Sequence, residues 1–148
     1  MNIANLLLGS AREFRDRPAV ARGDAVHLDY RGLWRRVSVM SMHLAVRFRL
    51  ERGDRVALAM TNGVEAIETM YAIWHAGMVA VPMNAKLHAR EFAFILRDSG
   101  AKLCIVTPDL AATIGEAARV SAAQLAVAKP AAKNRALHEA AASRRGTD

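Results

Sequence analysis

Histidine and cysteine are the residues of this chain best suited to hold a metal ion or to attack a substrate. The histidines are His27, His43, His75, His88 and His138. None stands four residues from another, and none belongs to an H-E-x-x-H pattern, so the spacing that places two imidazoles on one zinc ion is missing. His88 and Glu91 stand three residues apart, but the start of a helix explains both. We therefore expect no metal site.

Cys104 is the only cysteine, which excludes an internal disulfide and a multi-cysteine zinc site and is typical of a reducing compartment. It lies in an apolar run, so a buried, inert thiol is preferred over a nucleophile. The phosphate-binding patterns G-x-G-x-x-G and G-x-x-x-x-G-K-[ST] do not occur, and neither does the G-x-S-x-G turn of serine hydrolases. No residue is predicted to be catalytic, cofactor-binding or metal-binding.

Other conspicuous side chains have structural explanations. Trp34 and Trp74 stand at helical core spacing, which predicts packing, and His75 precedes Gly77 at a predicted helix end. Six arginines decorate one predicted helix and its exit: Arg31, Arg35, Arg36, Arg47, Arg49 and Arg52. Because that helix already has an apolar face, we interpret the arginines as a solvated face rather than a membrane or nucleic-acid patch.

The elements that would position such side chains follow from periodicity. Helices are predicted over residues 4–14, 31–49, from about 62 to 76, from 88 to 99 and from about 110 onward; strands are predicted over residues 18–21, 26–30, 56–60, 78–83 and 102–107. The last three strands are apolar on both faces and alternate with helices. This order predicts the α/β class: the first portion of a doubly wound parallel sheet with flanking helices.

Two details of the third helix are specific expectations. Asn62 with Glu65 is predicted to cap its start. From the 3.6-residue spacing, the buried face of this helix is predicted to consist of Val64, Ile67, Tyr71 and Trp74. Gly77 is predicted to end this helix in the left-handed conformation, and Gly100 is predicted to end the following helix.

Composition changes near residue 116. Leu, Ile, Val and Phe supply 4 of the 32 residues in 117–148, whereas Ala supplies 12, and that segment holds 6 basic and 2 acidic residues. We expect residues 1–116 to be the folded part and residues 117–148 to be a low-complexity, Ala-rich basic tail, helical or disordered. No apolar run reaches the length of a membrane span and the N-terminus is not typical of a signal peptide, so we expect a cytoplasmic protein.

Several segments resemble one family in order and spacing. Residues 28–33 (LDYRGL), 53–58 (GDRVAL), 71–84 (YAIWHAGMVAVPMN) and 85–102 (AKLHAREFAFILRDSGAK) resemble the L-T-Y-x-E-L, G-D-R-V-A, K-A-G-x-x-x-V-P-L-N and L-T-P-x-E-L-x-Y-I-L-x-D-S-G-A-K stretches of adenylate-forming enzymes. This superfamily contains acyl-CoA synthetases, luciferases and peptide-synthetase adenylation domains. The sequences of residues 74–77 (WHAG) and 84–91 (NAKLHARE) are most similar to bacterial fatty-acid–CoA ligases. Gly32 and His88 depart from the family's usual Glu and Thr.

The resemblance implies that residues 1–116 are the N-terminal portion of a large AMP-binding lobe, truncated. It implies a family reaction in which a carboxylate attacks Mg-ATP to give an acyl-adenylate, from which coenzyme A displaces AMP. The family's Pro-Lys-Gly phosphate loop, Tyr-Gly-x-Thr-Glu segment, ribose-binding Asp and catalytic Lys are all absent from these 148 residues. We therefore expect a truncated ligase fragment, produced by gene truncation or frameshift, with no activity alone and no ATP, Mg or coenzyme A site of its own.

Two other functions stay open. In the first alternative, the chain is an interaction module. It completes a split ligase by binding a partner chain, or it associates with itself through an uncovered sheet edge. In the second it binds nucleic acid non-specifically through its basic tail, as its pI of 10.5 permits. With 5% aromatic residues and no stacking motif, specific nucleic-acid recognition is not expected.

Overall fold

A computed structural model describes residues 2–128 of the chain. The helices are α1 (Ala4–Glu13), α2 (Tyr30–Arg47), α3 (Val64–His75), α4 (Ala89–Ser99) and α5 (Ala111–Ser121), with a single 3-10 turn, η1 (Pro108–Leu110). The strands are β1 (Pro18–Arg22), β2 (Ala25–Asp29), β3 (Arg55–Ala59), β4 (Val79–Met83), β5 (Leu103–Val106) and β6 (Gln124–Val127). The helices and strands predicted between residues 4 and 110 are confirmed, with ends that differ by one or two residues.

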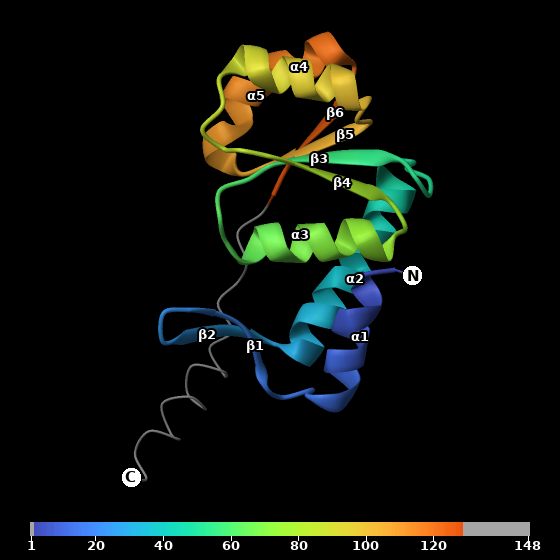
Figure 1. Cartoon of the computed structure of the whole chain (residues 1–148), viewed down its shortest axis with the longest axis vertical. Helices are drawn as coiled ribbons and strands as arrows, with labels where there is room; N and C mark the ends of the chain where they lie inside the picture. Colours follow the sequence, from blue (N-terminus) through green and yellow to red (C-terminus); the bar gives the residue numbers. More distant parts are fainter. Residues whose placement is uncertain (1, 129–148) are drawn as a thin grey trace.

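The larger sheet is parallel and has the order β4-β3-β5-β6. Figure 1 shows α3 on one face and α4 with α5 on the other. The chain runs from β3 outward to β4, then crosses back over β3 to β5 and continues to β6. This reversal is the doubly wound arrangement that the alternating strands and helices predicted.

Side chains of the central strands alternate between two cores. Val56, Leu58 and Ile105 pack with α2 and α3, whereas Ala57 and Cys104 pack on the opposite side with α4 and α5. Both faces are apolar because helices cover both, which explains the continuous hydrophobic runs in the sequence.

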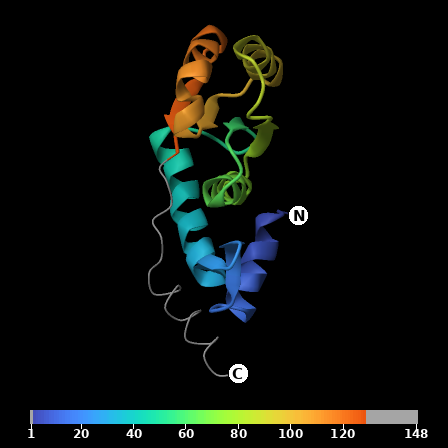
Figure 2. The same cartoon turned by 90° about the vertical axis from the view of Figure 1, so that its left-hand side faces the viewer.

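The N-terminal part forms a smaller unit beside this sheet. β1 and β2 pair as an antiparallel hairpin, and α1 and α2 pack together against α3. Figure 2 shows α2 as a long rod that runs from the hairpin toward β6. None of the described helices is long and apolar enough to cross a membrane.

Local signals for helix ends are confirmed at α3 and α4. Gly77 (φ 76°) and Gly100 (φ 61°) both adopt left-handed conformations. His88 is the N-cap of α4, and its backbone N–H donates to Glu91 Oε2 at 2.8 Å in a capping box. His88 therefore occupies the cap position, and the bond there runs from its backbone N–H to the Glu91 carboxylate.

The predictions for the start and the buried face of α3 are wrong in part. Gly63, not Asn62, is its N-cap residue, and no side chain caps it. Ile67 is 38% exposed. The buried positions of α3 are Val64, Glu68, Thr69, Ala72 and Ile73. The cause is that α3 lies between the sheet and the pair α1–α2, so it is covered on two sides and a single apolar stripe does not describe it (Figure 1).

Part of the Ala-rich segment expected from residue 117 belongs to the last helix and the last strand of the described fold. Residue 116 lies inside α5, where Ala117 and Ala118 are 3% and 2% exposed. β6 then pairs with β5 as the fourth strand of the sheet. Alanine supplies the close contacts here, so a count of large apolar residues missed them. Residues 129–148, with the remainder of the expected tail, lie outside the described residues.

Candidate functional site

The carboxyl ends of the parallel strands meet at one edge of the sheet. The register aligns Ala59 with Met83 and Val106, and Val106 with Val127. The connection after β3 leads to α3 on one face, and the connection after β5 leads to α5 on the other. Adjacent parallel strands whose connections diverge in this way form a switch point, the position where open α/β sheets bind ligands.

Two short segments border this switch point: residues 61–63 after β3 and residues 107–109 after β5. The Thr61 N–H donates to Thr107 Oγ1 at 3.3 Å, and the Thr107 N–H donates to the Ala59 carbonyl at 3.2 Å. Thr107 is buried, whereas Asn62 and Asp109 are exposed. The segments are therefore held against one another by backbone and hydroxyl groups.

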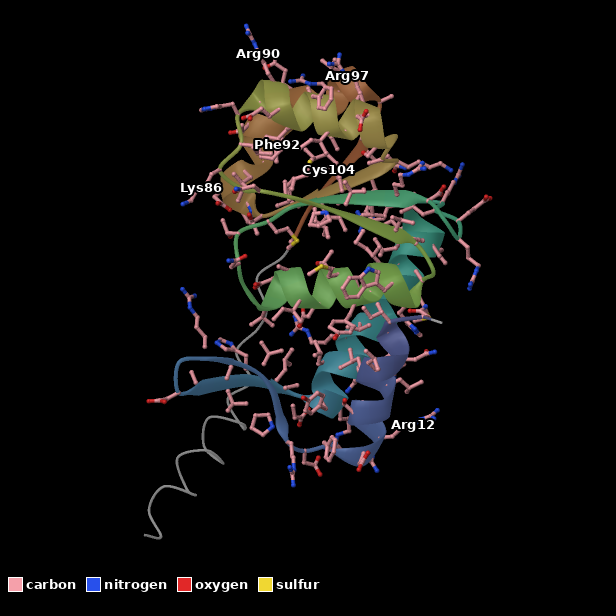
Figure 3. All side chains as sticks on the ribbon, viewed as in Figure 1. Arg12, Lys86, Arg90, Phe92, Arg97 and Cys104 are labelled. Carbon is pink, nitrogen blue, oxygen red and sulfur yellow. The ribbon has the colours of Figure 1, made fainter. Side chains whose placement is uncertain are left out.

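The polar groups at this edge do not make a metal centre. Within residues 2–128, no three or more His, Cys, Asp or Glu side chains are grouped so that they could hold a metal ion. The loop after β4 adds Lys86, an exposed cation whose backbone N–H donates to Asn84 Oδ1 at 2.9 Å (Figure 3). This edge can offer hydroxyl, amide and ammonium groups to an anion.

A groove of about 850 Å³ lies between α2 and the strands β5 and β6. We call it the α2–β6 groove. Its apolar lining includes Val39, Met40, Leu44, Phe48, Ile105 and Val127. Its basic lining consists of Arg35, Arg36 and Arg47, with His43 between them. The groove therefore combines an apolar floor with a cationic wall.

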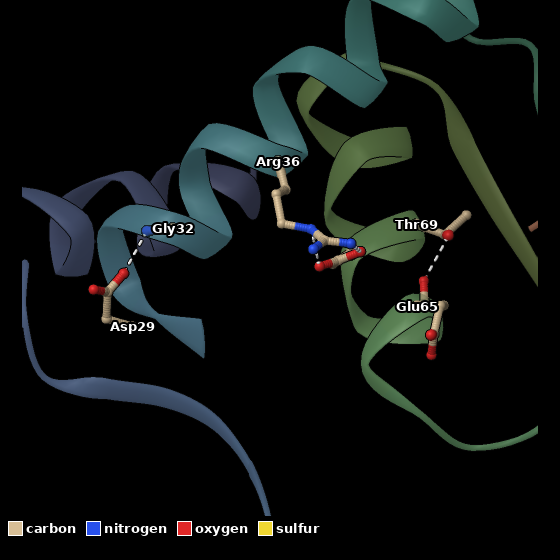
Figure 4. A network of polar contacts seen from close by, with 6 residues as sticks. Asp29, Gly32, Arg36, Glu65 and Thr69 are labelled. Atoms are coloured by element: carbon tan, nitrogen blue, oxygen red, sulfur yellow. Dashed lines mark hydrogen bonds and ion pairs between the residues drawn. The ribbon is translucent and has the colours of Figure 1, made fainter. Parts of the chain in front are cut away.

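One ion pair connects α2 to α3 at the edge of the groove. Arg36 Nε lies 2.5 Å from Glu68 Oε1, and Arg36 Nη2 donates to Glu68 Oε2 at 3.0 Å. Figure 4 shows Arg36 reaching from α2 toward α3. Glu68 is 5% exposed, and this burial raises the pKa of its carboxyl, with Arg36 opposing the rise. The pair joins the two helices at the edge of the groove.

Sequence reasoning missed this pair. The sequence places Arg36 on a solvated arginine face and gives no reason to expect that Glu68 is buried. A partial signal exists: Glu68 follows Val64 by four residues, and Arg36 follows Leu33 by three, so each lies beside a buried position on its own helix. No sequence pattern predicts that these two residues, which lie on different helices, contact each other.

Cys104 is buried between the sheet and α4, near Phe92, as the sequence predicted (Figure 3). Burial raises the pKa of the Cys104 thiol to about 12, which removes the thiolate that a nucleophile requires. The aromatic residues also pack: Trp34 contacts His75 with ring centroids 4.6 Å apart, and Trp74 contacts Tyr71 at 5.3 Å. His75 ends α3, as expected.

The fold and the sequence together define the class. The chain belongs to the family of AMP-binding enzymes, whose pattern it matches over residues 8–147. This match includes most of the Ala-rich segment, so the change of composition at residue 116 does not mark the end of the family resemblance.

Relatives within the family include CoA ligases. The chain is 35% identical over 113 residues to a long-chain-fatty-acid–CoA ligase of Haemophilus influenzae, covering 76% of this chain and 20% of that protein. It is 50% identical over 56 residues to the long-chain-fatty-acid–CoA ligase FadD13 of Mycobacterium tuberculosis, covering 38% of this chain and 11% of that protein. The matches therefore span a fifth or less of these two relatives.

Solved structures of CoA ligases are also similar to this chain. A Mycobacterium tuberculosis fatty acyl CoA synthetase is similar with a TM-score of 0.75 and 30% identity, over 86% of this chain and 26% of that chain. A benzoate CoA ligase from Burkholderia xenovorans is similar with a TM-score of 0.80 over 97% of this chain and 28% of that chain; at 22% identity, this likeness shows the fold alone.

Proposed function

We propose that this chain is the N-terminal part of a long-chain fatty-acid–CoA ligase and forms the first section of its large lobe. The observation that carries the proposal is the 35% identity to the Haemophilus influenzae ligase over 113 residues. The stronger local identity to FadD13 supports the same substrate class.

The reaction proposed for the whole ligase is the ATP-dependent joining of a long-chain fatty acid to coenzyme A, by way of an acyl-adenylate. The chain is also similar to a protein of different activity, a naringenin synthase of Pestalotiopsis fici, at 35% identity over 117 residues. The fatty-acid assignment therefore rests on which ligases are similar and not on any acid-binding residue of this chain.

We propose that residues 1–148 alone have no ligase activity. Adenylyl transfer builds negative charge on phosphate oxygens and needs cations or amides around them. The sequence contains none of the four family segments that supply these groups. Among residues 2–128, no three or more His, Cys, Asp or Glu side chains are grouped so that they could hold a metal ion. We derive no catalytic step through this chain and assign no residue to ATP, Mg or coenzyme A.

A chimera tests the substrate class. Residues 1–128 of this chain replace the matching segment of the Haemophilus influenzae ligase, and acyl-CoA formation is measured with palmitate and with benzoate. We expect a folded chimera that forms palmitoyl-CoA, and an isolated 148-residue chain that releases no pyrophosphate. A folded chimera that accepts benzoate but not palmitate would contradict the fatty-acid assignment, and pyrophosphate released by the isolated chain would contradict its inactivity.

The second candidate is a module that completes a ligase by binding a separate chain. The α2–β6 groove favours it, because an apolar groove with a basic wall is suited to a polypeptide surface. Mixing the chain with a ligase that lacks the matching segment distinguishes the candidates: restored activity indicates a module, and no restoration indicates a fragment without function alone. The nucleic-acid alternative rests on basic residues after position 128, outside the described residues, and stays a prediction.

A further inference from the structure

We propose that the outer face of α2 is a docking surface for an acidic amphipathic helix of a partner protein. The surface is formed by Arg35, Val39, Met42 and Val46, and we call it the outer stripe. Arg35 and Val39 border the α2–β6 groove, whereas Met42 and Val46 do not line it. The proposal goes beyond the ligase function, which gives this face of α2 no role.

The outer stripe is apolar at a place where a surface helix is normally polar. The buried face of α2 consists of Leu33, Val37, Ser41 and Leu44. With about 3.6 residues per turn, the outer stripe lies on the opposite side of the helix. Val39, Met42 and Val46 are 44%, 59% and 80% exposed. Single exposed apolar residues are ordinary, but three on neighbouring turns of one face form a continuous strip, and Figure 2 shows α2 along one side of the fold.

The charge beside the outer stripe favours an acidic partner. α2 contains four arginines and no Asp or Glu. Arg31 and Arg36 are already paired with carboxylates of the segment after α1 and of α3. Arg35 and Arg47 are exposed, and within residues 2–128 neither forms an ion pair. A carboxylate on an incoming surface would therefore meet guanidinium groups that are not yet neutralised, and such groups bind carboxylates in bidentate geometry.

The spacing of the outer stripe selects a helix as the partner element. Its four residues follow a 4-3-4 spacing, which is the pattern by which two helices pack side by side. Ser38 and Ala45 border the stripe and are small, so a second helix can approach closely. The Ser38 hydroxyl already donates to the Trp34 carbonyl at 2.9 Å, so contact with an apolar side chain does not leave it without a hydrogen bond.

The length of the stripe defines the partner helix. Arg35 and Arg47 stand 12 residues apart, since 47 − 35 = 12. At 1.5 Å per residue they are separated by about 18 Å along the helix axis. The partner therefore needs at least about three helical turns, with apolar residues at 3-4 spacing in the middle and carboxylates near both ends.

A lipid bilayer and a second copy of this chain are poorer occupants. A helix at a bilayer surface immerses a broad apolar face that includes aromatic side chains, whereas the apolar part of the outer stripe lies between Ser38 and His43 and has no aromatic residue. The broad apolar face of α2 is already buried in the core. A second copy would bring the same unpaired arginines and a net charge of +7.

The test uses the full 148-residue chain and a synthetic peptide. The seam peptide has about three heptads, with Leu at the two seam positions and Glu at the positions beside them. A shuffled peptide has the same composition and no apolar stripe, and a lysine peptide has Lys in place of each Glu. Fluorescence anisotropy of labelled peptide measures the dissociation constant, and circular dichroism checks that each protein variant is folded.

The protein variants are matched in pairs. Met42→Glu and Arg35→Glu change the outer stripe, and Val46→Glu is a second apolar variant. Phe94→Glu and Arg90→Glu are the controls, because Phe94 and Arg90 are exposed on α4, across the sheet from α3 (Figure 1).

We expect the wild-type chain to bind the seam peptide with a dissociation constant in the micromolar range, and the shuffled peptide at least tenfold more weakly. Each variant of the outer stripe should weaken binding of the seam peptide at least tenfold, and each α4 variant should change it less than twofold. Arg35→Glu should bind the lysine peptide more tightly than the wild-type chain does, because the charges on the two surfaces are then opposite again.

Several outcomes would overturn the docking surface. These are no binding of the seam peptide to the wild-type chain, equal binding of the seam and shuffled peptides, and equal effects of the α2 and α4 variants. Vesicles of phosphatidylglycerol and phosphatidylcholine that sediment the wild-type chain but not Met42→Glu would overturn it in favour of a bilayer. A dimer of the chain that Met42→Glu dissociates would overturn it in favour of a second copy.

Discussion

The Arg36–Glu68 pair places a carboxylate where water is excluded. Burial raises the pKa of Glu68 above its ordinary value of 4.5, so the folded state binds a proton more readily than the unfolded state. The stability linked to this group is therefore complete below pH 4.5 and is lost as the pH rises through the folded pKa. The pair joins α2 to α3, but the attraction of Arg36 does not outweigh the free-energy cost of burying the charged Glu68 carboxylate.

A pH series tests this linkage. We expect the wild-type free energy of unfolding to fall relative to that of Glu68→Gln as the pH rises above 4.5, because the variant carries no titrating carboxyl. Urea denaturation at intervals between pH 4 and pH 8 measures the difference. A difference that stays constant over this range would show that burial does not shift Glu68.

Removal of the Arg36 cation alone is expected to lower the stability of the fold more than removal of both charges of the pair. Arg36→Met leaves Glu68 buried without a counter-ion and should destabilise the fold by about 2–3 kcal/mol at pH 7. The double variant Arg36→Met/Glu68→Met should recover most of this loss, because neither charge is left buried alone. Urea denaturation of both variants checks the order, and a double variant that is less stable than Arg36→Met would contradict it.

Cys104 has its own test at the same scale. Its thiol is 0% exposed and has a pKa of about 12, so a disulfide reagent such as DTNB should not react with the folded chain at pH 8. The same reagent should react at once in 6 M guanidinium chloride. Rapid reaction under native conditions would mean that the layer formed by α4 and α5 opens readily.

At the scale of elements, two glycines are predicted to respond in opposite ways to the same substitution. Gly77→Ala should lower the free energy of unfolding by about 1–2 kcal/mol, because its φ of 76° disfavours a Cβ, which would also lie 3.1 Å from Arg52 Cζ. Gly9→Ala should raise it by about 0.5–1 kcal/mol, since Gly9 is inside α1 with open space around it. Thermal unfolding of both variants measures the contrast, and equal shifts would contradict it.

Gly32 illustrates how context changes such an estimate. The sequence alone predicts that a glycine near the start of α2 lowers the stability of the helix by about 1 kcal/mol relative to alanine. In the structure the Gly32 N–H donates to the Asp29 cap at 2.6 Å, and a Cβ on Gly32 would lie 2.9 Å from the same oxygen. An alanine would displace the capping carboxylate, so the gain from helix propensity is offset.

The elements were predictable where their signals are local. The turn at Gly77, the capping box at His88 and the two-sided apolar strands each occupy a few consecutive residues, and all were confirmed. The face of α3 was not predictable by the same reasoning, because helices that are distant in the sequence cover its second side. The Arg36–Glu68 contact joins residues 32 positions apart, which no helical period describes.

At the scale of the whole molecule, the folded unit extends beyond the change of composition. Ala117 and Ala118 are buried in the core shared with α4, and β6 adds a fourth strand beside β5. Close packing depends on fit as much as on side-chain volume. The predicted boundary at residue 116 was based on counts of Leu, Ile, Val and Phe, which do not register such contacts.

Two shortened chains test where the folded unit ends. A chain of residues 1–128 should retain a single cooperative unfolding transition. A chain of residues 1–116 should lose several kcal/mol or aggregate, because it exposes the edge of β5 and the face of α4 that α5 covers. Circular dichroism with urea measures both, and equal stability of the two chains would contradict a structural contribution from α5 and β6.

The rod-like form of α2 also fixes a length. From Gly32 to its C-cap residue Phe48, both of which line the groove, the helix advances about 24 Å at 1.5 Å per residue. An extended chain rises about 3.3 Å per residue, so roughly seven residues would reach from one end of the groove to the other. The length of α2 therefore sets the length of the groove. An extended segment that lay along the groove and was shorter than this would leave one end of the α2 wall exposed to water, and a longer one would have to bend away beyond Gly32 or Phe48.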